Sequence, residues 1–279
     1  MSAIWFRLPL AVMGVGLCGL GWAAGVEPRL LFVREAGVEL ANWPSEPLRV
    51  ALIADLHVGS PGVDPARVEA IAGVVTAAKP DLVLLLGDYD INAVPGGRHV
   101  ATSEWAPFLG RIPAPLGVHA VLGNHDWWND EDLIKEALQE EGIAVHDNGA
   151  VALRSGDQTF WLVGVGDLLT RHAAVEAALY DVPRGAPVLA MSHGPDVASS
   201  LAGRAELLVA GHTHGGQVNI PWVTEALLGR MSWYGQLTVD GLPVYVTSGI
   251  GTSVLPIRFN RPPEVVILTI TAARPTPRT

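Results

Sequence analysis

Short apolar runs that each end in a polar residue able to bind a ligand constrain the fold of this chain more than any other feature. Five such runs occupy residues 48–54, 82–86, 118–122, 188–191 and 207–210. The polar residues that follow them are Asp55, Asp88, Asn124, His193 and His212. Runs of this kind with helical patterns between them indicate strands buried on both faces, as in α/β proteins. Because ligands of open α/β sheets bind beyond the carboxyl ends of the strands, we expect these five side chains to converge.

The remaining pattern supports the same α/β class. Three further strands are expected at residues 160–165, 244–247 and 265–270. Asp64 and Pro65 have the pattern of a helix N-cap followed by proline at the first helical position. Asn129 is expected to cap a second helix that runs to about Glu141.

The donor types at the strand ends predict metal binding. Asp55 and His57 are two residues apart, as are His212 and His214, so each pair can present two donors from one short segment. Imidazole, carboxylate and amide donors suit first-row divalent ions such as Mn, Fe, Zn or Co. A thiolate site is excluded because the chain has a single cysteine. Seven candidate ligands exceed the need of one tetrahedral ion, and they fit a pair of ions that share a carboxylate.

The order of the motifs resembles the calcineurin-like metallophosphoesterase superfamily, over about residues 48–270. Extended motifs around His193 and His214, and the segment from Ile257 to Glu264, look like its bacterial membrane-associated branch of YkuE-like and YaeI-like proteins. The motifs stand here as Asp55-Leu56-His57, Gly87-Asp88, Gly123-Asn124-His125-Asp126, His193 and Gly211-His212-Thr213-His214.

This resemblance implies a four-layer αββα sandwich with the site at one edge. It also implies roles for the seven ligands. The first metal would be bound by Asp55, His57 and His214, the second by Asn124, His193 and His212, with Asp88 bridging the two. His125 would stabilise the transition state or protonate the leaving oxygen, and Asp126 would fix the tautomer of His125. Asp90 either supports the metal ligands from behind or is a solvated loop carboxylate, and the second interpretation is favoured.

The expected function is hydrolysis of phosphodiesters or pyrophosphates with two divalent ions, manganese first among them. In this hypothesis a hydroxide that bridges the two ions attacks phosphorus in line. A narrower alternative is a UDP-2,3-diacylglucosamine diphosphatase of lipid A synthesis, with a lipid-linked pyrophosphate as substrate. A metal-binding scaffold without catalysis is a different class of answer, and it is disfavoured because all seven ligands are present.

The N-terminus is expected to associate with a membrane. Leu8 to Val26 is a run of 19 residues without a charge, which is long enough to span a bilayer as a helix. It is interpreted as a single anchor in the bacterial inner membrane or as an export signal, for which Gly21-Trp22-Ala23 offers a cleavage site. A buried globular helix is the alternative, and the side of the membrane stays open. The expected organisation is an anchor or signal segment at 1–28, a catalytic domain at 29–273 and a tail at 274–279.

The net charge of −10 argues against a nucleic-acid partner, because nucleic-acid surfaces require clustered basic residues. The expected partner is instead a small phosphodiester or a lipid-linked pyrophosphate. Four tryptophans are candidates for an apolar rim around the site, with ordinary core packing as the alternative. They are Trp127, Trp128, Trp222 and Trp233.

Overall fold

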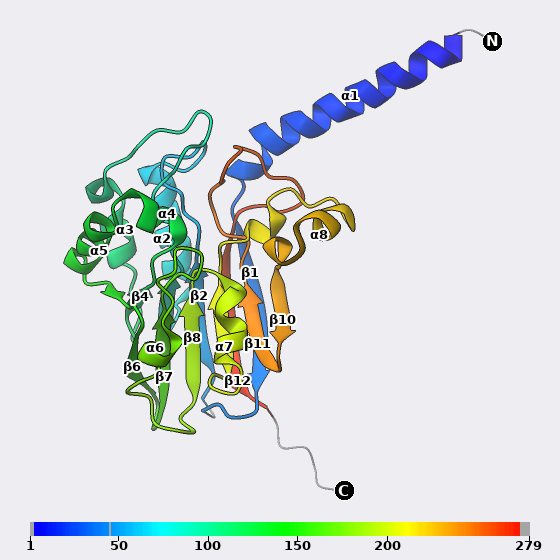
Figure 1. The fold of residues 1–279 in the computed structure, drawn as a ribbon. Helices are drawn as coiled ribbons and strands as arrows, with labels where there is room; N and C mark the ends of the chain where they lie inside the picture. Colours follow the sequence, from blue (N-terminus) through cyan, green and yellow to red (C-terminus); the bar gives the residue numbers. More distant parts are fainter. Residues whose placement is uncertain (1–2, 45, 274–279) are drawn as a thin grey trace, which may run out of the picture.

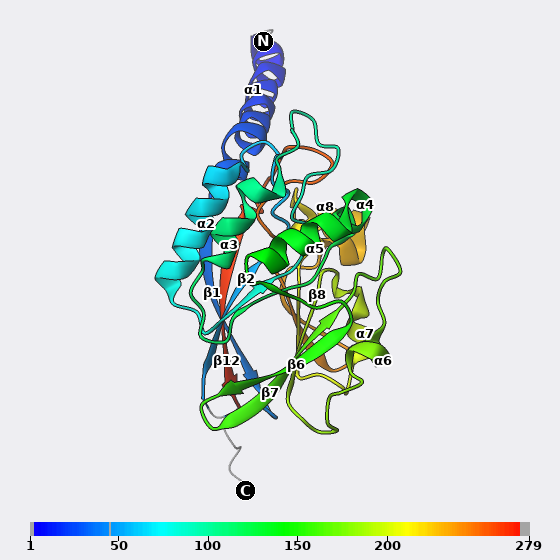
Figure 2. The same ribbon diagram turned by 90° about the vertical axis from the view of Figure 1, so that its left-hand side faces the viewer.

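Two six-stranded sheets pack face to face, and helices cover their outer faces (Figures 1 and 2). The computed structural model describes residues 3–44 and 46–273. One sheet has the order β1-β12-β2-β3-β4-β5, and the other has the order β10-β11-β9-β8-β7-β6. Helices α2, α3 and α5 flank the first sheet, and α6 and α7 flank the second (Figure 2). The expected αββα sandwich is therefore confirmed.

The first sheet is mixed. Strands β2 to β5 are parallel, whereas β12 runs antiparallel to β2 and parallel to β1. Its strands are β1 (Phe32–Leu40), β2 (Leu48–Ile53), β3 (Leu82–Leu85), β4 (Val118–Ala120), β5 (Ala144–Val145) and β12 (Glu264–Ala272).

The second sheet has a parallel centre and antiparallel edges. Strands β7, β8, β9 and β11 are parallel, and β6 and β10 are antiparallel hairpin partners at the edges. Its strands are β6 (Gly149–Ser155), β7 (Gln158–Val165), β8 (Val188–Ser192), β9 (Leu207–Ala210), β10 (Gly235–Val239) and β11 (Leu242–Val246).

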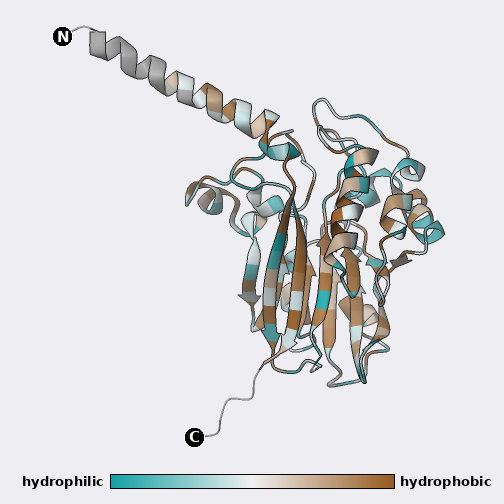
Figure 3. Ribbon diagram, turned by 180° about the vertical axis from the view of Figure 1, so that it is seen from behind, coloured by the Kyte–Doolittle hydropathy of each residue, from teal (hydrophilic) through white to brown (hydrophobic). Residues whose placement is uncertain are grey.

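The apolar runs of the sequence form the core between the sheets. Leu52 and Leu84 of the first sheet pack in one cluster with Leu162, Leu189 and Leu207 of the second. These side chains are no more than 1% exposed, and much of the length of the inner strands is hydrophobic (Figure 3). The burial of these apolar side chains supplies the main driving force for stacking the two sheets. Because the sheets are fixed to each other, their strand ends are fixed as well.

The helices follow capping signals of the sequence. Asp64 caps α2 (Pro65–Ala78) by accepting a 2.9 Å bond from the backbone of Arg67. The expected cap at Asn129 is wrong: Asp130 caps α5 (Glu131–Glu140), and Asn129 ends α4 (Asn124–Asn129). The shift arises because the chain makes a separate short helix from the metal motif before α5 begins. The shorter helices are α3 (Ala106–Gly110), α6 (Val175–Ala178), α7 (Ala198–Leu201) and α8 (Val223–Leu228).

The N-terminal helix α1 (Ala3–Gly25) leaves the domain at the end that also carries α8, and β12 runs to the opposite end (Figure 1). Among the residues that the structure describes, no helix has the length and apolar character needed to cross a bilayer. The expected tail at 274–279 lies outside the described residues.

Candidate metal centre

The loops after the central strands lie side by side and continue the sheet pairing beyond the strands. The amide of Asp55 donates to the carbonyl of Gly87, and that of His57 to the carbonyl of Asp88, both at 3.0 Å. In the second sheet, the Gly211 amide donates to the His193 carbonyl at 2.9 Å. These bonds hold the functional residues on rigid backbone at the carboxyl ends of the parallel strands, as the sequence predicted.

Five of the seven candidate ligands hold a left-handed backbone conformation, with φ between +44° and +69°. This conformation is uncommon outside glycine and clusters at functional sites, where surrounding contacts enforce it. Neighbouring glycines make room for the ligands: a Cβ on Gly123 would lie 2.2 Å from Asp88 Oδ1, and one on Gly211 would lie 2.6 Å from Asp55 Oδ2. The five residues are Asp55, His57, Asp88, His212 and His214.

Three overlapping groups of donors meet at the centre, and two of them match the expected ligand sets; the third joins His57 and Asp88 to His125. In the first group, Asp55, His57 and His214 have donor atoms that all lie within 4.8 Å of one another. Nε2 of His214 is 3.3 Å from Nε2 of His57 and 3.5 Å from Oδ1 of Asp55. Three converging donors of this kind match the ligand set expected for a first divalent ion.

The second group contains Asp88, His193 and His212, again with donor atoms within 4.8 Å of one another. Asn124 joins it, because its Oδ1 lies 3.1 Å from Nε2 of His193. Oδ2 of Asp88 is 3.2 Å from Nε2 of His193 and 3.6 Å from Nε2 of His57. Asp88 therefore lies between the two groups, where a bridging carboxylate has to be.

The charges of the centre favour a cation. Burial lowers the pKa of His57 and of His212 to about 4, so both rings are neutral and keep a lone pair at neutral pH. Burial also disfavours the charge on Asp88, but His193 and His57 hold the pKa of this carboxyl well below its usual range. Burial raises the pKa of Asp55 to about 7. His193 differs: burial disfavours its charge, but Asp88 raises its pKa to about 10, so His193 must lose a proton before it can bind a metal ion. A divalent ion would replace that positive charge beside the buried carboxylates.

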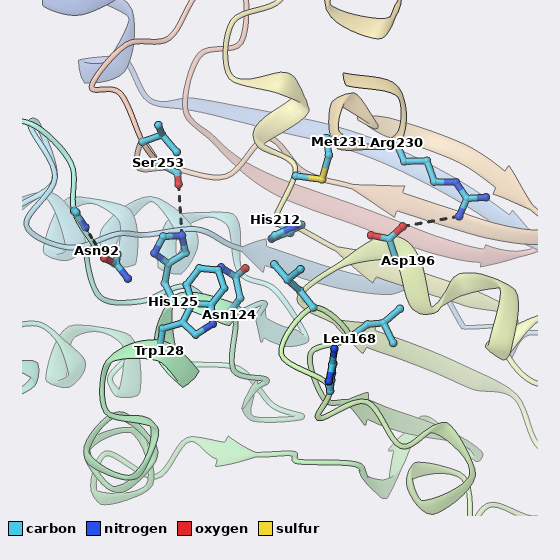
Figure 4. A pocket seen from close by; sticks show the side chains of 14 residues that line it. Asn92, Asn124, His125, Trp128, Leu168, Asp196, His212, Arg230, Met231 and Ser253 are labelled. Atoms are coloured by element: carbon cyan, nitrogen blue, oxygen red, sulfur yellow. Dashed lines mark hydrogen bonds and ion pairs between the residues drawn. The ribbon is translucent and has the colours of Figure 1, made fainter. Parts of the chain in front are cut away.

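His125 lies at the mouth of the centre. Its Nε2 is 3.9 Å from Oδ2 of Asp88 and 3.5 Å from the hydroxyl of Ser253, which sequence reasoning missed (Figure 4). Its backbone amide donates to Oδ1 of Asp88 at 2.9 Å. The Nδ1 atom of His125 is buried and has no hydrogen-bond partner among the described residues.

The expected contact between Asp126 and His125 is therefore wrong. Asp126 is fully buried, and its carboxylate accepts three backbone bonds of 2.8 Å, from Gly123, Asp88 and Tyr89. These bonds tie the Asp88 loop to the Asn124 loop. Asp126 thus positions the backbone of Asp88. It can do so because it is the third residue of α4, where its side chain turns back towards the strand end.

Sequence reasoning misjudged the surroundings of Asp90 and did not identify Arg258. Asp90 is 6% exposed, and its carboxylate accepts the amide of Ile91, so it is not a solvated carboxylate. Arg258 is fully buried, and its guanidinium donates to Nδ1 of His214 at 3.1 Å. Position alone could not identify Arg258, since it lies 44 residues beyond its histidine partner.

A cavity of about 850 Å³ opens on the centre and connects it to solvent (Figure 4). Its floor includes Asn124, His125 and His212. Of the four tryptophans, Trp128 lines the cavity and is 55% exposed, whereas Trp127 stacks on His172 with 3.6 Å between ring centroids. The other wall residues are Asn92, Ala93, Leu168, Leu169, Arg171, Asp196, Arg230, Met231, Ser253 and Val254.

The two-sheet fold and the paired donor groups together define a metallophosphoesterase, a class that binds two divalent ions at one edge of such a sandwich. Residues 48–216 match the profile of the calcineurin-like phosphoesterases, and the chain belongs to this family. It is a metal-dependent phosphoric ester hydrolase.

Relatives and one solved structure agree with this assignment. The phosphodiesterase YaeI of Escherichia coli is 30% identical and aligns over 90% of this chain and 89% of its own length. The metallophosphoesterase YkuE of Bacillus subtilis is 25% identical over 90% of each chain. A 5'-nucleotidase structure from Staphylococcus aureus has the same fold, with a TM-score of 0.50 and 12% identity; it aligns over 84% of this chain and 56% of that one.

Proposed function

We propose that this protein is a phosphodiesterase or pyrophosphohydrolase that binds two divalent ions in the two donor groups. The observation that carries the proposal is the placement of Asp88 between the groups, next to His125, which lines an open cavity. We favour manganese as the ion. In this proposal the first ion is bound by Asp55, His57 and His214. Asn124, His193 and His212 bind the second, with Asp88 shared.

Bound divalent ions would supply the charge that activates water and neutralises phosphoryl oxygens. The residues of the chain then orient the reaction. His125 is partly exposed to the cavity and burial lowers its pKa, so the neutral ring predominates near pH 7. It stands where it can donate a hydrogen bond to a phosphoryl or leaving oxygen, and Ser253 lies beside the same nitrogen.

The walls of the cavity favour substrates with an apolar substituent. Leu169 is 57% exposed, Met231 45% and Val254 73%, and all three line the cavity above His125 and His212. Val254 also holds a φ of +63°, which is strained for a β-branched residue. Arg171 lines the same wall and could meet a second negative charge. The UDP-2,3-diacylglucosamine pyrophosphatase LpxG of Chlamydia trachomatis, a relative 24% identical over 88% of this chain, acts on a substrate of this type.

Turnover of purified, manganese-loaded protein tests the function. We expect hydrolysis of bis(p-nitrophenyl) phosphate, and we expect Asp88→Asn to lose both metal and turnover. UDP-2,3-diacylglucosamine and a series of alkyl p-nitrophenyl phosphates then compare substrates. Each methylene that the cavity buries should raise kcat/KM by up to about fourfold. Metal-loaded protein that hydrolyses none of these esters would contradict the proposed function.

We further propose that residues 29–273 form the catalytic domain and work at a membrane surface, with residues 1–28 as the attachment. Trp222 is 87% exposed and Leu227 78% exposed, both at the α8 end of the domain where α1 emerges (Figure 1). Relatives from Danio rerio and Bos taurus are named as transmembrane proteins with a metallophosphoesterase domain. Vesicle flotation of full-length protein should be weakened by Trp222→Ser combined with Leu227→Ser; unchanged flotation would exclude α8 from the contact.

A further inference from the structure

We infer that Gln217 is a positioning residue for one wall of the cavity, and that through this wall it sets the preference for substrates with an apolar substituent. The wall in question is the loop of residues 253–257, called here the 253–257 loop. This inference rests on the proposed function, because selectivity is measured on esters that the centre hydrolyses. It adds a residue that is not among the seven metal ligands.

The 253–257 loop borders the place where the reaction would occur. Ser253 and Val254 line the cavity, and Oγ of Ser253 lies 3.5 Å from Nε2 of His125 (Figure 4). The side chain of Val254 is 73% exposed, so its apolar surface is free to be covered by a substrate. A substituent of a phosphoester held beside His125 would gain affinity by burying that surface.

The 253–257 loop depends on Gln217 for its support. Within the loop, the amide of Leu255 donates to the carbonyl of Ser253 at 2.7 Å, and that of Ile257 to the carbonyl of Leu255 at 2.9 Å. In the part of the chain that the structure describes, the hydrogen bonds that leave the loop go to Gln217, apart from the contact with His125.

The side chain of Gln217 bonds to the loop on both sides of Val254. Its Nε2 donates to the carbonyls of Ser253 and Leu255, both at 3.0 Å, and its Oε1 accepts the amide of Ser253 at 2.8 Å. Both amide protons and the amide oxygen are used, so the reversed orientation of the amide would place donor against donor. Val254 has a φ of +63°, a conformation that a β-branched residue keeps only where its surroundings enforce it. The bonds from Gln217 supply that enforcement.

The backbone of Gln217 is fixed independently of its side chain. Its amide donates to the carbonyl of His214 at 2.9 Å, and its carbonyl accepts the amide of Phe259 at 3.0 Å. A substitution at Gln217 keeps these two backbone bonds and removes the three bonds to the 253–257 loop. We therefore expect such a substitution to change the shape of the cavity wall and to leave the metal content at two ions.

The test is the ratio of kcat/KM for butyl p-nitrophenyl phosphate to kcat/KM for methyl p-nitrophenyl phosphate, measured on manganese-loaded full-length protein. The amount of active enzyme cancels in this ratio, so a loss of stability or of metal alone does not move it. The wild-type ratio should rise by up to about fourfold for each methylene that the cavity buries. Gln217→Met, similar in size but unable to make the three bonds, should lower the ratio by about fourfold, which corresponds to one methylene no longer buried.

A matched control and a double variant locate the effect. Gln236 is exposed on β10 and does not line the cavity, so Gln236→Met should keep the wild-type ratio. Val254→Ala removes apolar surface from the wall directly and should lower the ratio. Because Gln217 acts through Val254, the double variant should lower the ratio no further than Gln217→Met does alone.

A second substitution covers the case in which Gln217→Met does not fold. Gln217→Glu keeps an acceptor for the amide of Ser253 but turns a carboxylate oxygen towards two carbonyls, so it should also lower the ratio.

A wild-type ratio in the folded Gln217 variant, additive losses in the double variant, or a wild-type ratio near one would overturn the inference. Metal-loaded wild-type protein that hydrolyses neither ester would instead overturn the proposed function, so the two failures are distinguishable.

Discussion

At the scale of single residues, His125 is expected to have a different role from the metal ligands around it. It adjoins Asn124 in the chain, yet its Nε2 lies 3.9 Å from Asp88 and borders the cavity. We predict that His125→Ala retains both metal ions and lowers kcat by about 10²–10⁴-fold, the range for loss of a proton donor or an oxyanion partner. Metal content by elemental analysis and turnover of bis(p-nitrophenyl) phosphate check this. Wild-type turnover in that variant would remove His125 from the mechanism.

Asp126 is expected to behave differently from His125. Its carboxylate accepts three backbone amides, and an asparagine would place an N–H₂ group against at least one of them. We predict that Asp126→Asn lowers the free energy of unfolding by about 3 kcal/mol, because hydrogen bonds to a charged acceptor are lost. Metal affinity should fall with it, since Asp88 moves with this loop. Urea unfolding and metal titration check this; a loss of kcat at unchanged stability would instead support a role through His125.

At the scale of elements, a histidine pair joins β4 to the loop after β5. Nε2 of His119 lies 2.9 Å from the carbonyl of Leu116, so this nitrogen carries the proton. Nδ1 of His119 is then the acceptor of the 2.9 Å contact from Nε2 of His146. His119 must be neutral for this pair, because a proton on its Nδ1 would place two donors face to face.

The pair predicts a loss of stability in mild acid. Burial lowers the pKa of His146 from 6.5 to about 4, so between these values the unfolded chain binds a proton that the folded chain does not. The free energy of unfolding therefore falls as the pH falls from 6.5 to about 4, and is unaffected by His146 above that window. After allowance for the partial exposure of His146, we expect the free energy of unfolding to fall by about 2 kcal/mol across this window.

Urea unfolding at pH 7.5 and pH 4.5 measures this effect. His146→Gln should reduce the difference between the two pH values. An equal difference in wild type and His146→Gln would show that other groups cause the acid sensitivity.

At the scale of the whole molecule, the metal centre joins loops of both sheets. Asp55 and Asp88 come from the first sheet, and His193, His212 and His214 from the second. Bound ions should therefore stabilise the sandwich as a unit. Ions at 100 times their dissociation constant contribute about 2.7 kcal/mol per site, which corresponds to about 5–10 °C in Tm. Calorimetry before and after chelation checks this, and an unchanged Tm would mean that the centre holds no tightly bound ion.

The fold was largely predictable because its central strands are buried on both faces and read as apolar runs. All eight strands expected from such runs are present, from β2 to β12. The strands missed by sequence reasoning are β1, β5, β6 and β10. Most of their residues are exposed or only partly buried, so these strands are defined by their pairing and not by an apolar run. β1, for example, pairs with β12 over nine residues, each 232 positions from its partner.

The sequence by itself determined the α/β class and the order of the candidate donors, because strand ends within one parallel sheet lie at one edge. The stacking of the two sheets, which joins their donors, belongs to the tertiary structure. Only the tertiary structure decided what Asp126 and Arg258 contact. Asp126 satisfies backbone amides of two loops, and Arg258 reaches His214 from a segment fixed by α1. Hydrogen bonds between distant segments depend on where the backbone places its donors and acceptors, and no local pattern of residues records that placement.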